Sequence, residues 1–133
     1  MKLIPINITK GISDYEGNIE VYIPEINQNI TCSFVSISYK DMVKEFPIHT
    51  EIDAILIKSY SSISETDNNE QQLGSIATGI YRGKEIIDGD EYYKIESSID
   101  IFSDNELSGF VEPTSIGKWV QVTGEYQLIK KQD

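Results

Sequence analysis

The stretch SIATGIYRGKEIIDGDEYYKIESSIDIF, residues 75–102, decides the fold class of this chain. Its two halves meet at Asp88-Gly89, a pair that suits the two positive-φ positions of a type I′ turn, so the stretch predicts a β-hairpin. Gly79 and Gly83 in the first arm mark bulges or bends. In the second arm, alternate residues are expected to share the inward face: Tyr93, Ile95, Ser97, Ile99 and Ile101.

Strand-like patterns recur on both sides of this hairpin. Further strands are predicted over residues 2–8, 18–24, 30–37, 51–60 and 118–130. In the first of them, Ile4, Ile6 and Ile8 are expected to share one face because they are two residues apart.

One short helix interrupts the strands. Ser38 is a candidate N-cap, and Pro47 ends the helical pattern. A helical spacing of i, i+3, i+4 and i+7 predicts one buried stripe, formed by Tyr39, Met42, Val43 and Phe46.

Length and composition favour one domain over residues 1–133, with 39% hydrophobic residues and no βαβ repeat. We therefore expect an all-β protein, mainly an antiparallel barrel or sandwich, with one short packed helix. No apolar run approaches the roughly 18 residues of a membrane span. Pro5 and Asn7 interrupt the first apolar run, so we expect no secretory signal and a cytoplasmic location.

The stretch GKWVQVTG, residues 117–124, resembles the closing strand of an oligonucleotide/oligosaccharide-binding (OB) fold. The long strand predicted from residue 51, with its polar loop insertions, is also similar to that fold. The resemblance covers residues 51–130 and implies an OB-like barrel, with nucleic-acid binding as one alternative function.

Negative charge is concentrated in one window of the sequence. Residues 85–112 contain nine carboxylates and a single lysine, which is −8 of the total net charge of −11. Such a window attracts cationic partners and repels nucleic acid. The nearby Arg82, Lys84 and Lys94 are too few to reverse this preference.

No motif for catalysis or for a cofactor is present. His49 is the single histidine, no Gly-x-Ser-x-Gly turn presents a nucleophile, and neither phosphate-binding glycine motif occurs. Cys32 is the single cysteine, which excludes an internal disulfide and a cysteine-based metal site. We therefore expect a non-enzymatic protein without cofactor or metal.

Recognition of a basic protein is the function that this charge pattern favours. Carboxylates would steer the partner and exposed aromatic residues would anchor it. The predicted partner-binding residues are Asp88, Asp90, Glu91, Tyr92, Glu96, Asp100, Asp104, Glu106 and Phe110. In size and charge the chain is similar to bacterial immunity proteins, which implies an inhibitor that covers a basic partner such as a toxin.

The polar segment of residues 61–74 supports an alternative. It is long for a connection in a compact domain, which is typical of a mobile loop or a binding loop. The alternative function is a small ligand-binding or enzymatic β-barrel with a pocket at its mouth beneath this segment.

Overall fold

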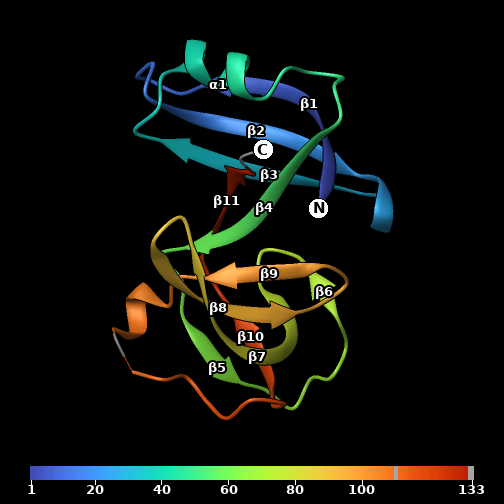
Figure 1. Cartoon of the computed structure of the whole chain (residues 1–133), viewed down its shortest axis with the longest axis vertical. Coiled ribbons are helices and arrows are strands. Elements are labelled where there is room, and N and C mark those ends of the chain that lie inside the picture. Colours follow the sequence, from blue (N-terminus) through green and yellow to red (C-terminus); the bar gives the residue numbers. More distant parts are fainter. Residues whose placement is uncertain (110, 132–133) are drawn as a thin grey trace. The chain divides into compact units, whose positions relative to one another are not determined.

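The computed structural model describes residues 1–109 and 111–131, and most of its elements are β-strands (Figure 1). In the described residues, α1 (Tyr39–Glu45) is the single α-helix, so the predicted all-β class with one short helix is confirmed. The backbone contacts group the chain into a first unit, Met1–Ile55 with the segment from Tyr126 onward, and a second unit, Leu56–Glu125. The single domain over residues 1–133 stays a prediction.

The first unit contains an antiparallel meander with α1 packed against it (Figure 1). Its strands are β1 (Lys2–Lys10), β2 (Glu16–Ile23) and β3 (Gln28–Val35), and the short 3-10 turn η1 (Pro24–Ile26) joins β2 to β3. The other edge of β1 pairs with β4 (Ile52–Ser59), which also pairs with β11 (Glu125–Lys130). Ile19 lies opposite Cys32 and Val21 opposite Ile30, so these cross-strand pairs form the buried face.

The N-terminal cap of α1 forms as predicted, but the buried face of the helix is narrower than predicted. The Ser38 hydroxyl accepts a hydrogen bond from the Asp41 amide at 3.1 Å. Met42 and Phe46 are buried, whereas Val43 is 41% exposed. The prediction for Val43 is therefore wrong, because a helix of two turns that packs on one sheet face buries only its central stripe.

The prediction that Ile4, Ile6 and Ile8 share one face of β1 is wrong as well. The register of β1 against β2 shifts between Pro5 and Asn7, as in a β-bulge. Leu3, Pro5 and Ile8 are buried, while Ile4 and Ile6 are only half-buried. A single extra residue exchanges the two faces of a strand, so strict alternation failed here.

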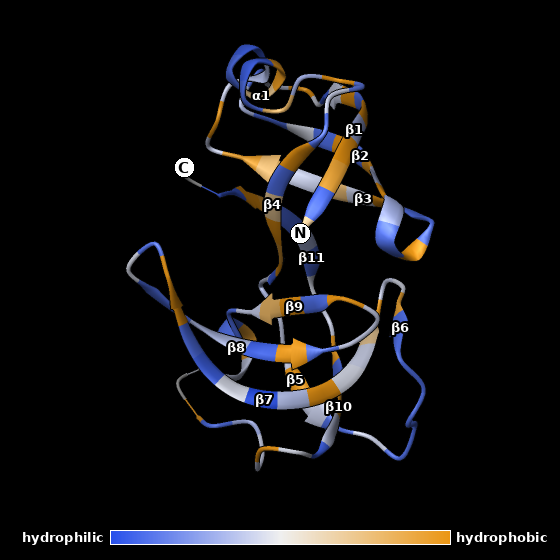
Figure 2. Ribbon diagram, turned by 45° about the vertical axis from the view of Figure 1, so that its right-hand side comes forward, coloured by the Kyte–Doolittle hydropathy of each residue, from blue (hydrophilic) through white to orange (hydrophobic). Residues whose placement is uncertain are grey.

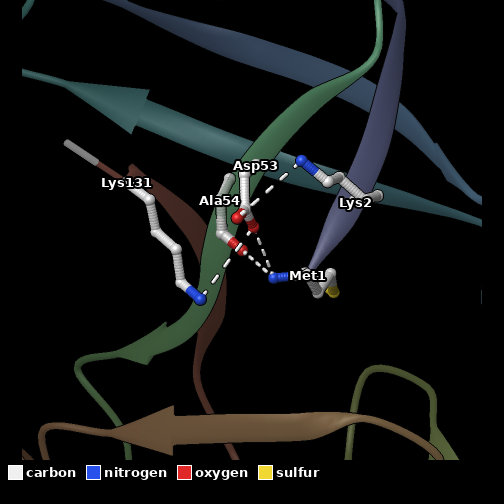
Figure 3. Close-up of polar contacts among 5 residues, drawn as sticks. All are labelled: Met1, Lys2, Asp53, Ala54 and Lys131. Atoms are coloured by element: carbon white, nitrogen blue, oxygen red, sulfur yellow. Dashed lines mark hydrogen bonds and ion pairs between the residues drawn. The ribbon is translucent and has the colours of Figure 1, made fainter. Parts of the chain in front are cut away.

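The Asp53 carboxylate on β4 is the centre of a cluster of positive charges (Figure 3). Its Oδ1 atom accepts a hydrogen bond from the α-amino group of Met1 at 2.7 Å, and the same group donates to the Ala54 carbonyl at 3.0 Å. The Nζ atoms of Lys2 and Lys131 each lie 4.0 Å from Asp53. The hydrogen bond from the α-amino group is the main reason that the pKa of Asp53 lies below its ordinary value.

The second unit is a curved sheet around the predicted hairpin. Its strands follow the order β4, β9 (Asp100–Ser103), β8 (Asp90–Glu96), β7 (Ala77–Ile87), β10 (Trp119–Val122) and β5 (Ile63–Glu65), with β6 (Gln72–Leu73) also on β7. All these pairs are antiparallel except β4 with β9. The 3-10 turn η2 (Glu106–Ser108) follows β9. In the described residues the hydrogen-bonded path ends at β5, so it forms an open sheet and not a closed barrel.

The hairpin forms where the sequence predicted it. Asp88 and Gly89 have φ angles of 51° and 86°, as a type I′ turn requires, and the register shifts between Tyr81 and Lys84, where Gly83 has a φ of 98°. The second arm is not one strand, however, because it turns after Glu96 and returns as β9. All five residues expected on the inward face are nevertheless buried.

The last predicted strand is also divided in two, at Gly124. This residue has a φ of 116°, and a Cβ atom there would lie 2.6 Å from the carbonyl oxygen of Ser59. The fully buried Lys58 stabilises the backbone at this break. Its Nζ atom donates hydrogen bonds to the carbonyls of Ser75 at 2.7 Å and Gly124 at 2.8 Å. The alternating sequence pattern did not reveal this break.

Candidate functional site

The β7–β8 hairpin positions the first half of the acidic window. The turn at Asp88 and Gly89 brings Asp90 and Glu91 to the start of β8, directly before Tyr92. Tyr92 lies opposite Glu85 in the register and is half-buried, while Asp90 and Glu91 are exposed.

Hydrogen bonds hold the second half of the window in a fixed corner after β9. The Asp104 carboxylate accepts hydrogen bonds from the amides of Tyr60, Ser61 and Glu106 at 2.9, 3.0 and 3.0 Å. The Ser61 hydroxyl donates to it at 2.7 Å. The next residue, Asn105, is buried and accepts a hydrogen bond from the Ile63 amide at 3.0 Å. Asp104 therefore stabilises a turn through charge-assisted hydrogen bonds.

These two segments line one hollow of about 760 Å³, which we call the acidic hollow. Its lining residues are Asp90, Glu91, Tyr92, Tyr93, Asp104, Glu106 and Gly109. Five of them are among the nine residues predicted to bind a partner, so the structure brings these five together. The sequence did not single out Tyr93, which was expected only as a core residue, or Gly109.

The electrostatic field around Tyr92 is negative. Desolvation is the main cause that raises the pKa of its phenol, and the negative charges of Asp90, Asp104 and Asp88 raise it further. Asp88 thus contributes to the field at Tyr92, although it does not line the hollow. A cation placed beside Tyr92 would be stabilised by the same charges.

The remaining predicted residues lie in ion pairs or outside the described residues. Glu96 pairs with Arg82 at 2.6 Å, and Asp100 pairs with Lys94 at 3.6 Å. In each pair the cation lies on the neighbouring strand, Arg82 on β7 beside β8 and Lys94 on β8 beside β9, and it compensates the carboxylate. Phe110 lies outside the described residues.

Lys84 compensates two more carboxylates of the window. Its Nζ atom lies 3.1 Å from Glu112 and 3.7 Å from Glu91. The buried Tyr81 also donates its hydroxyl to Glu112 at 2.6 Å, and this bond, more than the one from Lys84, lowers the pKa of Glu112. Among the described residues, five carboxylates of the window form no ion pair: Glu85, Asp88, Asp90, Asp104 and Glu106.

Exposed apolar side chains occur beside the acidic hollow. Leu107 follows Glu106 and is 68% exposed, and Ile86 lies opposite Glu91 and is 63% exposed. Figure 2 shows a hydrophobic band near the tip of the β7–β8 hairpin. Exposed apolar residues next to uncompensated charge are typical of a protein-binding surface.

A second hollow, of about 530 Å³, lies beneath the segment that was predicted as a mobile or binding loop. We call it the tryptophan hollow, and it is lined by Glu65, Thr66, Asp67, Asn69, Lys118 and Trp119. The segment of residues 61–74 includes the short strands β5 and β6, and the chain between them is strongly hydrophilic (Figure 2). The sequence had suggested the loop but not the part played by Trp119.

No protein family and no curated protein matches this sequence. The OB-like and immunity-type resemblances therefore have no support from known relatives. In the described part of the chain, no helix is long and apolar enough to cross a membrane. The same residues contain no group of three or more histidine, cysteine or acidic side chains arranged to hold a metal ion.

Proposed function

We propose that this chain is a non-enzymatic, cytoplasmic protein-binding module whose acidic hollow receives a basic side chain of a partner protein. The observation that carries the proposal is that five of the predicted residues line the same hollow, with Tyr92 among them. A guanidinium or ammonium group there would meet the carboxylates of Asp90 and Glu106, which form no ion pair with described residues.

The tyrosine rings of the acidic hollow provide a second kind of interaction with a cation. Cations are attracted to aromatic rings, and Lys84 of this chain already lies 5.9 Å from the centre of the Tyr93 ring. The apolar side chains of Ile86 and Leu107 would bury surface around the inserted cation. In this proposal the partner is a basic protein, such as a toxin that the module inhibits in the manner of an immunity protein.

Nucleic-acid binding is the weaker alternative for this surface. Arg82, Lys84 and Lys94 are each engaged with a carboxylate of the same unit. A phosphate would have to displace those carboxylates, at a cost that its own contacts would need to exceed.

A titration with defined probes tests the proposal. The amide resonances of ¹⁵N-labelled protein are followed while N-acetyl-arginine methylamide or its lysine counterpart is added, with the uncharged norleucine compound as the control. Residues 90–93 and 104–109 should shift with the basic probes only. Equal shifts with norleucine, or shifts spread evenly over the chain, would contradict the proposal.

Variants make the test specific. The double variant Asp90→Asn/Glu106→Gln should weaken binding of the arginine probe about fivefold, as expected for the loss of exposed charge pairs worth roughly 1 kcal/mol. The matched control, Glu25→Gln/Glu51→Gln, changes the net charge equally at two exposed residues of the first unit. If both double variants weaken binding equally, the effect belongs to net charge and not to the hollow.

The tryptophan hollow supports a second candidate function, the binding of a small ligand beneath residues 61–74. The specific observation is a hollow of about 530 Å³, which falls in the range of roughly 300–1,000 Å³ that is usual for small-molecule sites.

A further inference from the structure

Two strands far apart in the sequence build the wall of the tryptophan hollow. In the pairing of β5 with β10, Glu65 lies opposite Val120. The Thr66 amide extends this pairing by donating to the Trp119 carbonyl at 3.1 Å. The backbone beside Trp119 is therefore held by sheet hydrogen bonds on the side of β5.

The loop that completes the hollow is braced by its own side chains. The Asn68 amide donates to the Thr66 hydroxyl at 3.2 Å, and the Glu70 amide donates to the Asn68 side-chain oxygen at 3.1 Å. On the other side, the Thr114 hydroxyl donates to Glu65 at 2.8 Å. Such bracing lowers the entropy cost of ordering these residues when a ligand binds.

Several polar side chains around the hollow have no hydrogen-bond or ion-pair partner among the residues that the structure describes. The side chains of Asp67, Asn69 and Lys118 form no hydrogen bond or ion pair with other described residues, and neither does the indole N–H of Trp119. They supply both donors and acceptors to a ligand. Trp119 is half-buried and provides an apolar surface among them.

The charges and hydrogen-bonding groups of the lining favour one class of ligand. Two carboxylates and one ammonium give the lining a net charge of only −1. A phosphate-bearing ligand would meet Glu65 and Asp67, and an organic cation would meet Lys118. A sugar is neutral, its hydroxyls both donate and accept, and its C–H faces can pack on an indole ring.

We propose that the tryptophan hollow binds a neutral oligosaccharide, an inference that rests on the second candidate function and names its ligand class. The sugar hydroxyls bind the side chains of Asp67, Asn69 and Lys118, and one sugar ring packs on Trp119. This site is separate in its lining residues from the acidic hollow.

The single tryptophan of the chain provides the test, because its fluorescence reports on this hollow alone. Cellotriose, maltotriose and triacetylchitotriose are each titrated, with tetramethylammonium and a short oligo-dT as rival probes. At least one trisaccharide should change the Trp119 emission saturably and shift the amides of residues 65–69 and 118–119. If all three leave both signals unchanged, or if only a rival probe titrates, the proposal is overturned.

Substitutions at exposed positions keep the test independent of folding. Asn69→Ala should weaken saccharide binding about tenfold, as expected for the loss of one or two hydrogen bonds. Gln71→Ala, in the same loop but outside the lining, is the matched control and should bind like the parent protein. Equal affinities of Asn69→Ala and Gln71→Ala would contradict the assigned contacts.

The two sites can fail independently. Asn69→Ala should leave binding of the arginine probe unchanged, and Asp90→Asn/Glu106→Gln should leave saccharide binding unchanged. Loss of saccharide binding in the Asp90→Asn/Glu106→Gln variant would show that the sugar occupies the acidic hollow and would overturn this inference without affecting the first proposal.

Discussion

The Asp104 carboxylate binds Ser61 twice, through the Ser61 amide at 3.0 Å and through its hydroxyl at 2.7 Å. Ser61 is completely buried, and its hydroxyl also lies 2.7 Å from the hydroxyl of Ser103. Asp104 therefore has a structural role that the other carboxylates of the acidic hollow do not have. Its carboxylate connects the end of β4 to the end of β9 through hydrogen bonds. Its removal should therefore affect stability first.

We expect Asp104→Ala to lower the free energy of unfolding by about 2–3 kcal/mol, because it leaves several backbone and hydroxyl donors without an acceptor. Chemical denaturation measures this change. Glu106→Ala is the control: it lines the same hollow but is exposed, and its substitution should cost no more than about 0.5 kcal/mol. Equal losses in the two variants would contradict the structural role of Asp104.

Asp53 should make the stability depend on acid pH. Its folded-state pKa lies below the ordinary value of 3.8, so the carboxylate stabilises the fold above that value. This stabilisation is lost as the pH falls through the lower folded-state pKa. We expect Asp53→Asn to be less stable than the parent protein at neutral pH, and we expect the difference to shrink as the pH falls through the folded-state pKa of Asp53.

Denaturant titrations across this pH range check the prediction for Asp53. Glu51→Gln, an exposed neighbour that forms no ion pair with described residues, is the control. A constant difference in stability between Asp53→Asn and the parent protein at every pH would rule out the charge interactions shown in Figure 3 as its cause.

Tyr81→Phe should raise the pKa of Glu112. The Tyr81 hydroxyl is the largest cause that lowers this pKa, and Lys84 is the second, so the substitution should move the pKa toward its ordinary value without reaching it. Carboxyl ¹³C chemical shifts followed against pH measure the change, with Glu85 as an internal reference. An unchanged Glu112 titration would show that the 2.6 Å hydrogen bond does not persist in solution.

Gly79→Ala should destabilise the β7–β8 hairpin severely. A Cβ atom there would lie 2.8 Å from the Ile95 side chain and would collide with the Glu96 backbone, so we expect a loss of at least about 2 kcal/mol. Gly74→Ala is the matched control, since its nearest atom would be at 3.7 Å and its φ is not positive. It should be neutral or stabilise by up to about 1 kcal/mol. Thermal unfolding distinguishes the two outcomes.

Local signals account for the parts of the fold that the sequence predicted well. Asp88 and Gly89 favour positive φ whatever surrounds them, and Ser38 caps α1 through an amide three residues away. Where the prediction failed, a distant contact decided the result. The bulge at Pro5 depends on the pairing of β1 with β2, and the break at Gly124 depends on the close approach of Ser59.

The sequence by itself determined the all-β class, the position of the hairpin and the excess of negative charge in residues 85–112. Only the tertiary structure decided which carboxylates keep that charge unpaired, because Coulomb energy depends on distance and burial, which strand register sets. The tertiary structure pairs Glu96 with Arg82 and leaves Asp90 without an ion pair among the described residues. It also placed Trp119 beside Asp67, since residues so far apart in the chain meet only when β5 and β10 pair.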